Sequence, residues 1–272
     1  MTQERRPYRA GLVQFDIKRG RVDANLRTVL RWLHRLAERN VRLAVLPEMW
    51  PSSMVADDVD RLVDESEVAL QEIRRFARQH RMTIVGSSYE RAGNGIYNTA
   101  YVIDADGTVN GQYRKIHLFS PAGEHIHFQS GDVPLVVNTA AGRLGVIICY
   151  DLRFPELLRM LCEQGAEVLI VPAQWPSARQ DHWDTLLRAR AIENQVYVIG
   201  CNRTGHEQRS SGLALSYGGG STIIDPWGNT LASRKATAGI ADADIDFAVI
   251  DKVRRSIPVW SDRMPNTYRI KT

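Results

Sequence analysis

Three residues of different chemistry follow apolar segments of this 272-residue chain. Glu48 follows the run VRLAVLP, Lys115 follows a β-rich segment that ends two residues earlier, and Cys149 closes the run RLGVIIC. Reactive side chains of α/β proteins collect just beyond the carboxyl ends of strands, because the strand is rigid and the loop after it exposes the side chain. A carboxylate, an ammonium and a thiol are therefore predicted at comparable places in the fold.

These residue types suit a nucleophilic attack on a carbonyl carbon. The thiolate is the reactive form of cysteine, and an unperturbed thiol has a pKa of about 8.5, so a base or cation beside Cys149 must help it to ionise. Glu48 could accept that proton and later deliver it to a leaving amine. Lys115 could face the oxygen that becomes negative in the tetrahedral intermediate, with the backbone N–H of Tyr150 as a second donor.

Each of the three residues also has an ordinary structural explanation. A single cysteine at the end of an apolar strand is most often a core residue, and Cys201 ends a similar segment. Cys162 lies among leucines in an expected helix and is interpreted as core. Glu48 could cap the element after Pro47, and Lys115 could be a solvated charge. Residue types alone leave both interpretations open.

Apolar periodicity predicts the elements that position these residues. Alternating or continuous apolar runs indicate strands, and apolar residues every three or four positions indicate helices. We expect helices at 22–37, 68–77, 155–162 and 181–194. We expect strands at 8–15, 41–46, 82–85, 135–138, 144–149, 168–171, 196–200 and 221–224, with two more around a turn between 97 and 113. This alternation predicts a layered α/β fold, but it does not decide between one sheet and two.

The chain is expected to form one domain over residues 1–272, because no linker, repeat or low-complexity tract divides it. Residues 253–272 contain four arginines and two prolines. We interpret them as an extended C-terminal arm that lies on its own domain or on a neighbouring subunit.

Composition excludes several classes of protein. With 44% hydrophobic and 24% charged residues, the chain is typical of a globular protein rather than a disordered one. Its formal charge of +4 comes from scattered Lys and Arg residues, so no nucleic-acid partner is expected. Three widely separated cysteines favour a reducing, cytoplasmic location. No apolar run is typical of a signal peptide or a membrane span, so no membrane contact is expected.

Motifs for metal or nucleotide chemistry are weak. His125 and His127 lie two residues apart beside Glu124, but the sequence has neither an HExxH motif nor paired CxxC motifs. The run GGGS at 218–221 lacks the lysine of a phosphate-binding loop. We therefore expect no metal ion and no organic cofactor.

Three segments resemble the signature regions of the nitrilase superfamily of carbon–nitrogen hydrolases, and they occur in the order that the family has them. Weaker resemblance extends over nearly the whole chain. The signature-like segments are LPEM at 46–49, YRKIHLF at 113–119 and CYDLRFPE at 149–156, and the others are VPAQW at 171–175, HW at 182–183, ARAIENQ at 189–195 and DPWG at 225–228.

Carried over residue by residue, the resemblance implies that Cys149 is the nucleophile and that Glu48 is the general base and then the general acid. It implies that Lys115 stabilises the oxyanion, and that Glu124 is a second glutamate that orients the lysine and the substrate. It also implies a four-layer α-β-β-α sandwich with two mixed β-sheets. The family further implies a homodimer or larger homo-oligomer, with helices after the nucleophile and at 181–194 in the interface.

Within the superfamily the chain is most similar to the ω-amidase-like branch, through its CYDLRFP and PAQW segments and GCNRTG at 200–205. This similarity implies hydrolysis of a small 2-oxo acid ω-amide, such as 2-oxoglutaramate, with release of ammonia. The alternatives are a deaminated-glutathione amidase, an N-carbamoyl compound hydrolase and a non-catalytic small-molecule-binding protein on the same fold.

An anionic substrate of this kind should meet a cation in the pocket. Arg153, Arg179 and Arg203 are the candidates, because each lies in a loop or beside a strand end. Tyr150 and Trp175 are further candidates for substrate contact, although Trp175 suits the core equally well.

Thiol alkylation separates the catalytic interpretation from the non-catalytic one. A catalytic Cys149 should react fastest of the three cysteines with iodoacetamide, and activity should be lost in step with its modification. The measurement is mass-spectrometric mapping of labelled peptides against time. Equally slow labelling of all three thiols would favour a binding protein.

Overall fold

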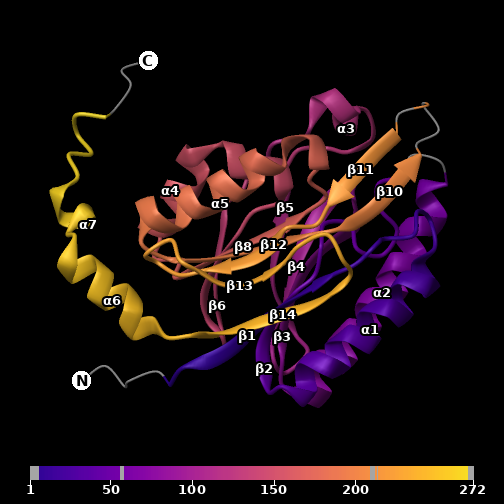
Figure 1. Cartoon of the computed structure of the whole chain (residues 1–272). Helices are drawn as coiled ribbons and strands as arrows, with labels where there is room; N and C mark the ends of the chain where they lie inside the picture. Colours follow the sequence, from indigo (N-terminus) through magenta and orange to yellow (C-terminus); the bar gives the residue numbers. More distant parts are fainter. Residues whose placement is uncertain (1–5, 56–57, 209–211, 213, 269–272) are drawn as a thin grey trace.

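The computed structural model describes residues 6–55, 58–208, 212 and 214–268. Two six-stranded sheets face each other, and helices cover the outer face of each sheet (Figure 1). The predicted four-layer α-β-β-α sandwich is confirmed, and the number of sheets that periodicity left open is two.

The first sheet is mixed and has the strand order β14-β1-β2-β3-β4-β5. β1, β2 and β3 run parallel to one another, and the remaining pairs are antiparallel. Its strands are β1 (Tyr8–Gln14), β2 (Val41–Val45), β3 (Thr83–Ala92), β4 (Gly95–Ile103), β5 (Val109–Arg114) and β14 (Gly239–Ile245).

The second sheet repeats this plan with the order β13-β12-β9-β8-β7-β6, in which β7, β8 and β9 are parallel. A separate two-stranded hairpin consists of β10 (Thr204–Gln208) and β11 (Ala214–Gly218). The strands of the second sheet are β6 (Leu135–Thr139), β7 (Gly142–Val146), β8 (Val168–Ala173), β9 (Tyr197–Asn202), β12 (Ser221–Ile224) and β13 (Thr230–Arg234).

Two helices lie outside each sheet (Figure 1). α1 (Val22–Glu38) and α2 (Val59–His80) cover the first sheet, and α4 (Pro155–Glu163) and α5 (Gln180–Asn194) cover the second. The other helical elements are η1 (Ser120–Ala122), α3 (Glu124–His127), η2 (Cys149–Arg153), η3 (Ser177–Arg179), α6 (Phe247–Ser256) and α7 (Val259–Asp262).

Burial along the strands follows the positions of these layers. On β2, Leu43 and Val45 belong to the core between the two sheets, whereas Ala44 belongs to the core beneath α1 and α2. This alternation is expected because successive strand side chains point to opposite faces. β8 is buried at every position, because one of its faces meets the other sheet and the opposite face meets helices.

The C-terminal arm differs from the expected extended segment at its start. Val253 lies within α6, which buries Phe247, Ile250 and Val253 at three-residue spacing and is capped by the Asp246 side chain. In Figure 1, α6 and α7 project from one side of the sandwich. The last four residues of the arm, 269–272, lie outside the described residues, and contact of the arm with a neighbouring subunit stays a prediction.

Periodicity also does not predict the hairpin of β10 and β11 or the strand β14, in which polar residues interrupt the apolar ones. On the outer helices of the second sheet, Met160 of α4 and Ile192 of α5 are 41% and 50% exposed. The expected subunit interface on these helices also stays a prediction.

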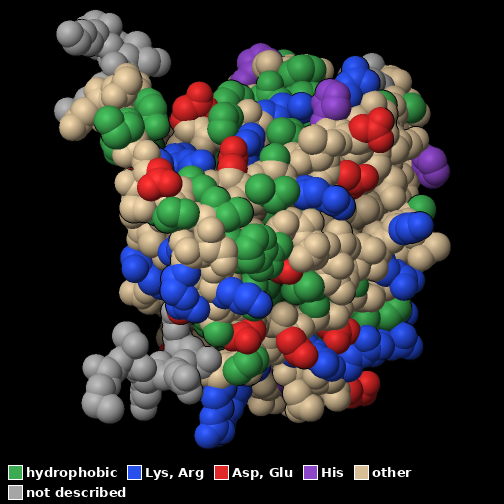
Figure 2. Space-filling model, turned by 60° about the vertical axis from the view of Figure 1, so that its left-hand side comes forward, with side chains coloured by type: hydrophobic (Ala, Val, Ile, Leu, Met, Phe, Trp, Pro, Cys, Tyr) green, Lys and Arg blue, Asp and Glu red, His purple; other side chains and the backbone are tan. Residues whose placement is uncertain are grey.

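Among the helices of the described residues, none combines the length and apolar character that a bilayer crossing requires. Within the same residues, no group of three or more His, Cys, Asp and Glu side chains is arranged to hold a metal ion. On the face shown in Figure 2, Asp and Glu side chains lie among the Lys and Arg side chains.

The packing of α5 on the second sheet requires a glycine at position 200. A Cβ atom at Gly200 would lie 2.5 Å from Leu187 Cδ1 and 2.8 Å from Trp183 Cζ2, both fully buried on α5. Gly200→Ala should therefore lower the free energy of unfolding by about 1–3 kcal/mol, measured by urea denaturation. Gly111→Ala on the edge strand β5 is the control, because its Cβ would meet the partly exposed Leu135 at 3.1 Å and should cost less.

Candidate active site

The side chains of Glu48, Lys115 and Glu124 meet in a buried cluster. The Lys115 ammonium lies 2.8 Å from Glu48 Oε1, and 2.9 and 2.8 Å from Glu124 Oε1 and Oε2. All three residues are at most 3% exposed. Glu48 follows β2, Lys115 follows β5 and Glu124 begins α3, so the fold brings together three sequence-predicted residues from separate loops.

The two carboxylates keep the lysine charged. Burial alone disfavours an ammonium, but the negative charges of Glu124 and Glu48 outweigh burial and raise the pKa of Lys115 well above its ordinary value. Lys115 is therefore a fixed cation throughout the neutral pH range.

Asn98 of β4 is a further member of the cluster that residue types alone do not single out. Its fully buried Nδ2 donates to Glu48 Oε1 at 2.9 Å and to Glu124 Oε1 at 3.3 Å. Its backbone C=O accepts from Lys115 N at 2.9 Å. A neutral donor thus bridges two carboxylates that repel each other. The sequence does not mark this residue, because Asn98 is one of several polar residues in β4.

Cys149 lies on a sharp turn after β7. Its φ of 47° is in the left-handed region, which costs a non-glycine residue about 1–2 kcal/mol. This turn places Cys149 on the wall of a cavity of about 60 Å³, although the residue is only 7% exposed. The cavity is lined by Phe119, Cys149, Tyr150, Arg153, Gln174, Trp175, Pro176 and Arg179.

The state of the thiol differs from the expectation that its neighbours ionise it. Burial and the Glu48 carboxylate raise the pKa of Cys149 well above its ordinary value, and the opposing effect of Lys115 is smaller. Cys149 therefore keeps its proton at neutral pH. A base must remove that proton during attack, and the carboxylate whose charge acts on the thiol is Glu48.

Asp151, two residues after the nucleophile, joins the turn to the segment that holds Lys115. Its Oδ1 accepts from His117 N at 2.9 Å and lies 2.8 Å from His117 Nδ1. Its Oδ2 accepts from the Tyr113 hydroxyl at 2.8 Å and from Ile148 N at 2.9 Å. One buried carboxylate thus fixes the turn at Cys149 against the strand end that precedes Lys115.

Four of the five predicted substrate-contact residues line the cavity: Tyr150, Arg153, Trp175 and Arg179. The Arg153 guanidinium lies over the Trp175 ring at 4.5 Å, and Trp175 is 2% exposed, so the indole is both a cavity wall and a core residue. Within the described part of the chain, neither Arg153 nor Arg179 forms an ion pair with a carboxylate.

Arg203 is placed differently from the prediction that it faces the substrate. It is fully buried, does not line the cavity, and pairs with Glu207 Oε2 at 2.6 Å. The competing thiol of Cys201 is also fully buried and donates to the carbonyl oxygens of Val13 and Val45. Cys201 is therefore a structural residue, as is Cys162, which α4 buries in the core.

A family profile described as carbon-nitrogen hydrolase matches residues 9–255. The chain belongs to the carbon–nitrogen hydrolases of the nitrilase superfamily. The hydrolase is 37% identical over 258 residues to a protein named 2-oxoglutaramate amidase from Bacillus subtilis (strain 168), a match that covers 94% of this chain and 97% of that protein. It is 36% identical over 240 residues to omega-amidase YafV from Escherichia coli (strain K12), with 88% and 90% covered.

Solved structures agree with this assignment. The crystal structure of a carbon-nitrogen hydrolase from Helicobacter pylori G27 superposes on the hydrolase with a TM-score of 0.91 at 27% identity. The superposition covers 96% of this chain and 97% of the other.

Removal of the nucleophile or of the base should abolish turnover without unfolding the hydrolase. Cys149→Ala and Glu48→Gln change little volume, and each should lower kcat for an amide substrate by about 10³-fold or more. The measurements are ammonia release and far-ultraviolet circular dichroism.

Lys115→Ala provides a contrast, because it leaves two buried carboxylates without their cation. It should also be inactive, but its free energy of unfolding should fall by about 3–5 kcal/mol. Turnover by a folded Cys149→Ala variant that matches the unsubstituted enzyme would contradict the assignment of the nucleophile.

Proposed function

We propose that the hydrolase is an ω-amidase, which converts the terminal amide of a short 2-oxo acid ω-amide, such as 2-oxoglutaramate, to a carboxylate and ammonia. The observation that carries this proposal is that one small cavity is lined by Cys149 together with two arginines, Arg153 and Arg179. A carboxylate at one end of the substrate would meet Arg153 and Arg179, while the amide carbon meets Cys149. The names of the two relatives above support the same substrate class.

In the proposed first half-reaction, Cys149 Sγ attacks the amide carbon and its proton passes to Glu48. The carbonyl oxygen becomes an oxyanion, stabilised by the Lys115 ammonium and the backbone N–H of Tyr150. Glu48 then gives the proton to the amide nitrogen, the carbon–nitrogen bond breaks, and ammonia leaves a thioester on the enzyme.

In the second half-reaction, water attacks the thioester carbon while Glu48 takes one of its protons. The carbon–sulfur bond breaks, the product leaves as a carboxylic acid, and the proton on Glu48 returns to the sulfur. The sum is one amide and one water converted to one acid and one ammonia, without any cofactor.

Hydrogen bonding supports Glu48 rather than Glu124 as the proton carrier. Both Glu124 oxygens accept from Lys115, and they also accept from Asn98 Nδ2 and Phe119 N. In the described hydrogen bonds, Glu48 Oε2 accepts one N–H, from Gln174 at 2.8 Å. That oxygen has capacity for a proton, whereas Glu124 is occupied in orienting Lys115.

The proposal is tested by ammonia release from a panel of substrates. The panel contains 2-oxoglutaramate, 2-oxosuccinamate, deaminated glutathione, an N-carbamoyl amino acid and propionamide. We expect the highest kcat/KM for 2-oxoglutaramate. Arg153→Gln should lower kcat/KM for that substrate by about 10- to 100-fold, through loss of a charge-assisted hydrogen bond, while the value for neutral propionamide changes little.

Arg27→Gln on the exposed face of α1 is the matched control and should leave both values unchanged. Preference for the N-carbamoyl compound, or equal loss on acidic and neutral amides in Arg153→Gln, would rule out the ω-amidase assignment. Neither outcome would affect the assignment of the chain as a carbon–nitrogen hydrolase.

A further inference from the structure

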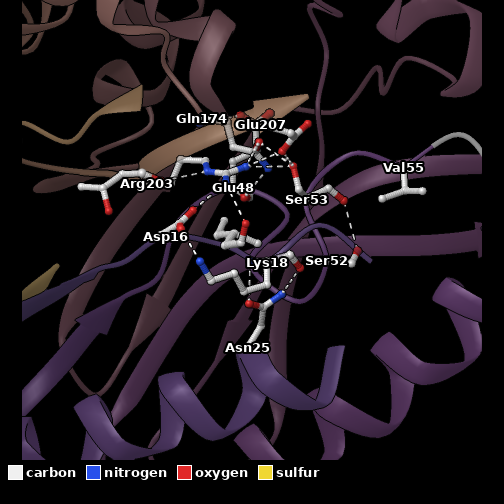
Figure 3. Close-up of polar contacts among 12 residues, drawn as sticks. Asp16, Lys18, Asn25, Glu48, Ser52, Ser53, Val55, Gln174, Arg203 and Glu207 are labelled. Carbon is white, nitrogen blue, oxygen red and sulfur yellow. Dashed lines mark hydrogen bonds and ion pairs between the residues drawn. The ribbon is translucent and has the colours of Figure 1, made fainter. Parts of the chain in front are cut away.

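The Arg203 side chain lies outside the cavity, and both of its Nη atoms donate hydrogen bonds to buried or partly buried groups (Figure 3). It is 0% exposed, and its guanidinium lies over the Tyr217 ring at 4.3 Å. Its Nη1 donates to Glu207 Oε2 at 2.6 Å, Ser53 Oγ at 3.0 Å and Gln174 Oε1 at 3.2 Å, and its Nη2 donates to Ile17 O at 2.7 Å and Asp16 Oδ1 at 3.3 Å.

A buried ion pair of this kind is not explained by stability alone. Removing both charges from water costs several kcal/mol, and apolar residues of similar size often serve a core as well or better. The groups that Arg203 touches therefore indicate what the pair does. Ser53 belongs to the loop that carries Glu48, and Gln174 contacts Glu48 from the end of β8.

Arg203 fixes the orientation of the Gln174 side chain. A guanidinium has only donors, so the amide atom that faces it must be the oxygen. The amide Nε2 then points the other way and donates to the backbone C=O of Glu48 at 3.0 Å. The backbone N–H of the same glutamine donates to Glu48 Oε2 at 2.8 Å. Gln174 therefore holds both the main chain and the carboxylate of Glu48.

The loop that carries Glu48 needs such a support. Met49 and Ser53 have φ angles of 46° and 62°, in the left-handed region that is unfavourable for residues with a side chain. The Ser53 hydroxyl accepts from Arg203 and lies 3.0 Å from Gln174 Oε1. Arg203 therefore holds the end of this strained loop at Ser53, and the same guanidinium orients Gln174.

We propose that the Arg203–Glu207 ion pair is a positioning device for the catalytic carboxylate, and acts on Glu48 through Gln174 and Ser53. The inference rests on the proposed role of Glu48 as general base. Neither residue of the pair lines the cavity beside Cys149. Their loss should therefore slow the proton transfers without weakening substrate binding.

The test is steady-state kinetics of two variants with the best amide from the panel, at a temperature well below the melting temperature of each. Arg203→Met/Glu207→Leu removes both charges together, so no charge is left buried alone. Its kcat should fall by about tenfold or more, with KM within about twofold of the unsubstituted value. Ser53→Ala removes one hydroxyl and should lower kcat by about three- to tenfold.

Ser66→Ala is the matched control, because it also removes a buried serine hydroxyl, on α2 and away from the site. It should leave kcat and KM unchanged. A purely structural role for the ion pair predicts a lower melting temperature with unchanged kcat, and that result in the double variant would overturn the proposal. If the double variant does not fold, Ser53→Ala decides: an unchanged kcat rejects the positioning role.

Glu48→Gln separates this inference from the function on which it rests. An inactive Glu48→Gln variant beside a fully active double variant would reject only the positioning role. An active Glu48→Gln variant would instead reject Glu48 as the base, whatever the double variant does.

Discussion

The contact between one buried ammonium and two buried carboxylates sets the chemistry of this site. Lys115, Glu48 and Glu124 together carry one net negative charge in a volume from which water is excluded. Burial raises the pKa of the Cys149 thiol, and the nearby Glu48 carboxylate raises it further, because a second negative charge on the sulfur is unfavourable there. The cluster therefore favours the protonated thiol. In the proposed mechanism, attack places the negative charge on a carbonyl oxygen that faces Lys115.

This arrangement exists only while the two sheets remain packed together. Glu48 and Lys115 follow strands of the first sheet, whereas Cys149 and Gln174 follow strands of the second. The apolar core between the sheets fixes the distance between Glu48 and Cys149. A small set of polar contacts then fixes the orientation of the two side chains. Asp151 is one such contact, because it joins the nucleophile turn of one sheet to Tyr113 of the other. The relative positions of Glu48 and Cys149 therefore depend on the packing of the two sheets and not on either loop alone.

Sequence reasoning predicted the candidate site residues because they stand at strand ends and form recognisable segments, and the fold brings Glu48, Lys115 and Glu124 together. It also found most strands and the outer helices, whose burial follows simple periods. It could not find Asn98 or the partners of Arg203, because nothing in a single sequence marks which polar residue will be buried. In the sequence, Arg203 and Arg153 both lie in a loop or beside a strand end. Only the fold shows that Arg203 pairs with Glu207, whereas Arg153 lines a cavity. The thiol's protonation state likewise depends on charges distant in sequence.

The same net charge also explains how the proposed substrate would be oriented. A carboxylate placed beside Glu48 and Glu124 would be repelled, whereas one placed at the cavity wall near Arg153 and Arg179 would be attracted. The favourable pose of an acidic amide is therefore the one with its neutral amide toward the thiol. Arg203 cannot contribute to this selection, because Glu207 and Asp16 already neutralise it inside the protein. Among the described residues, Arg153 and Arg179 at the cavity have no carboxylate partner, whereas Arg203 behind it is paired. In the proposed function, one residue type thus serves both substrate recognition and the rigidity of the site.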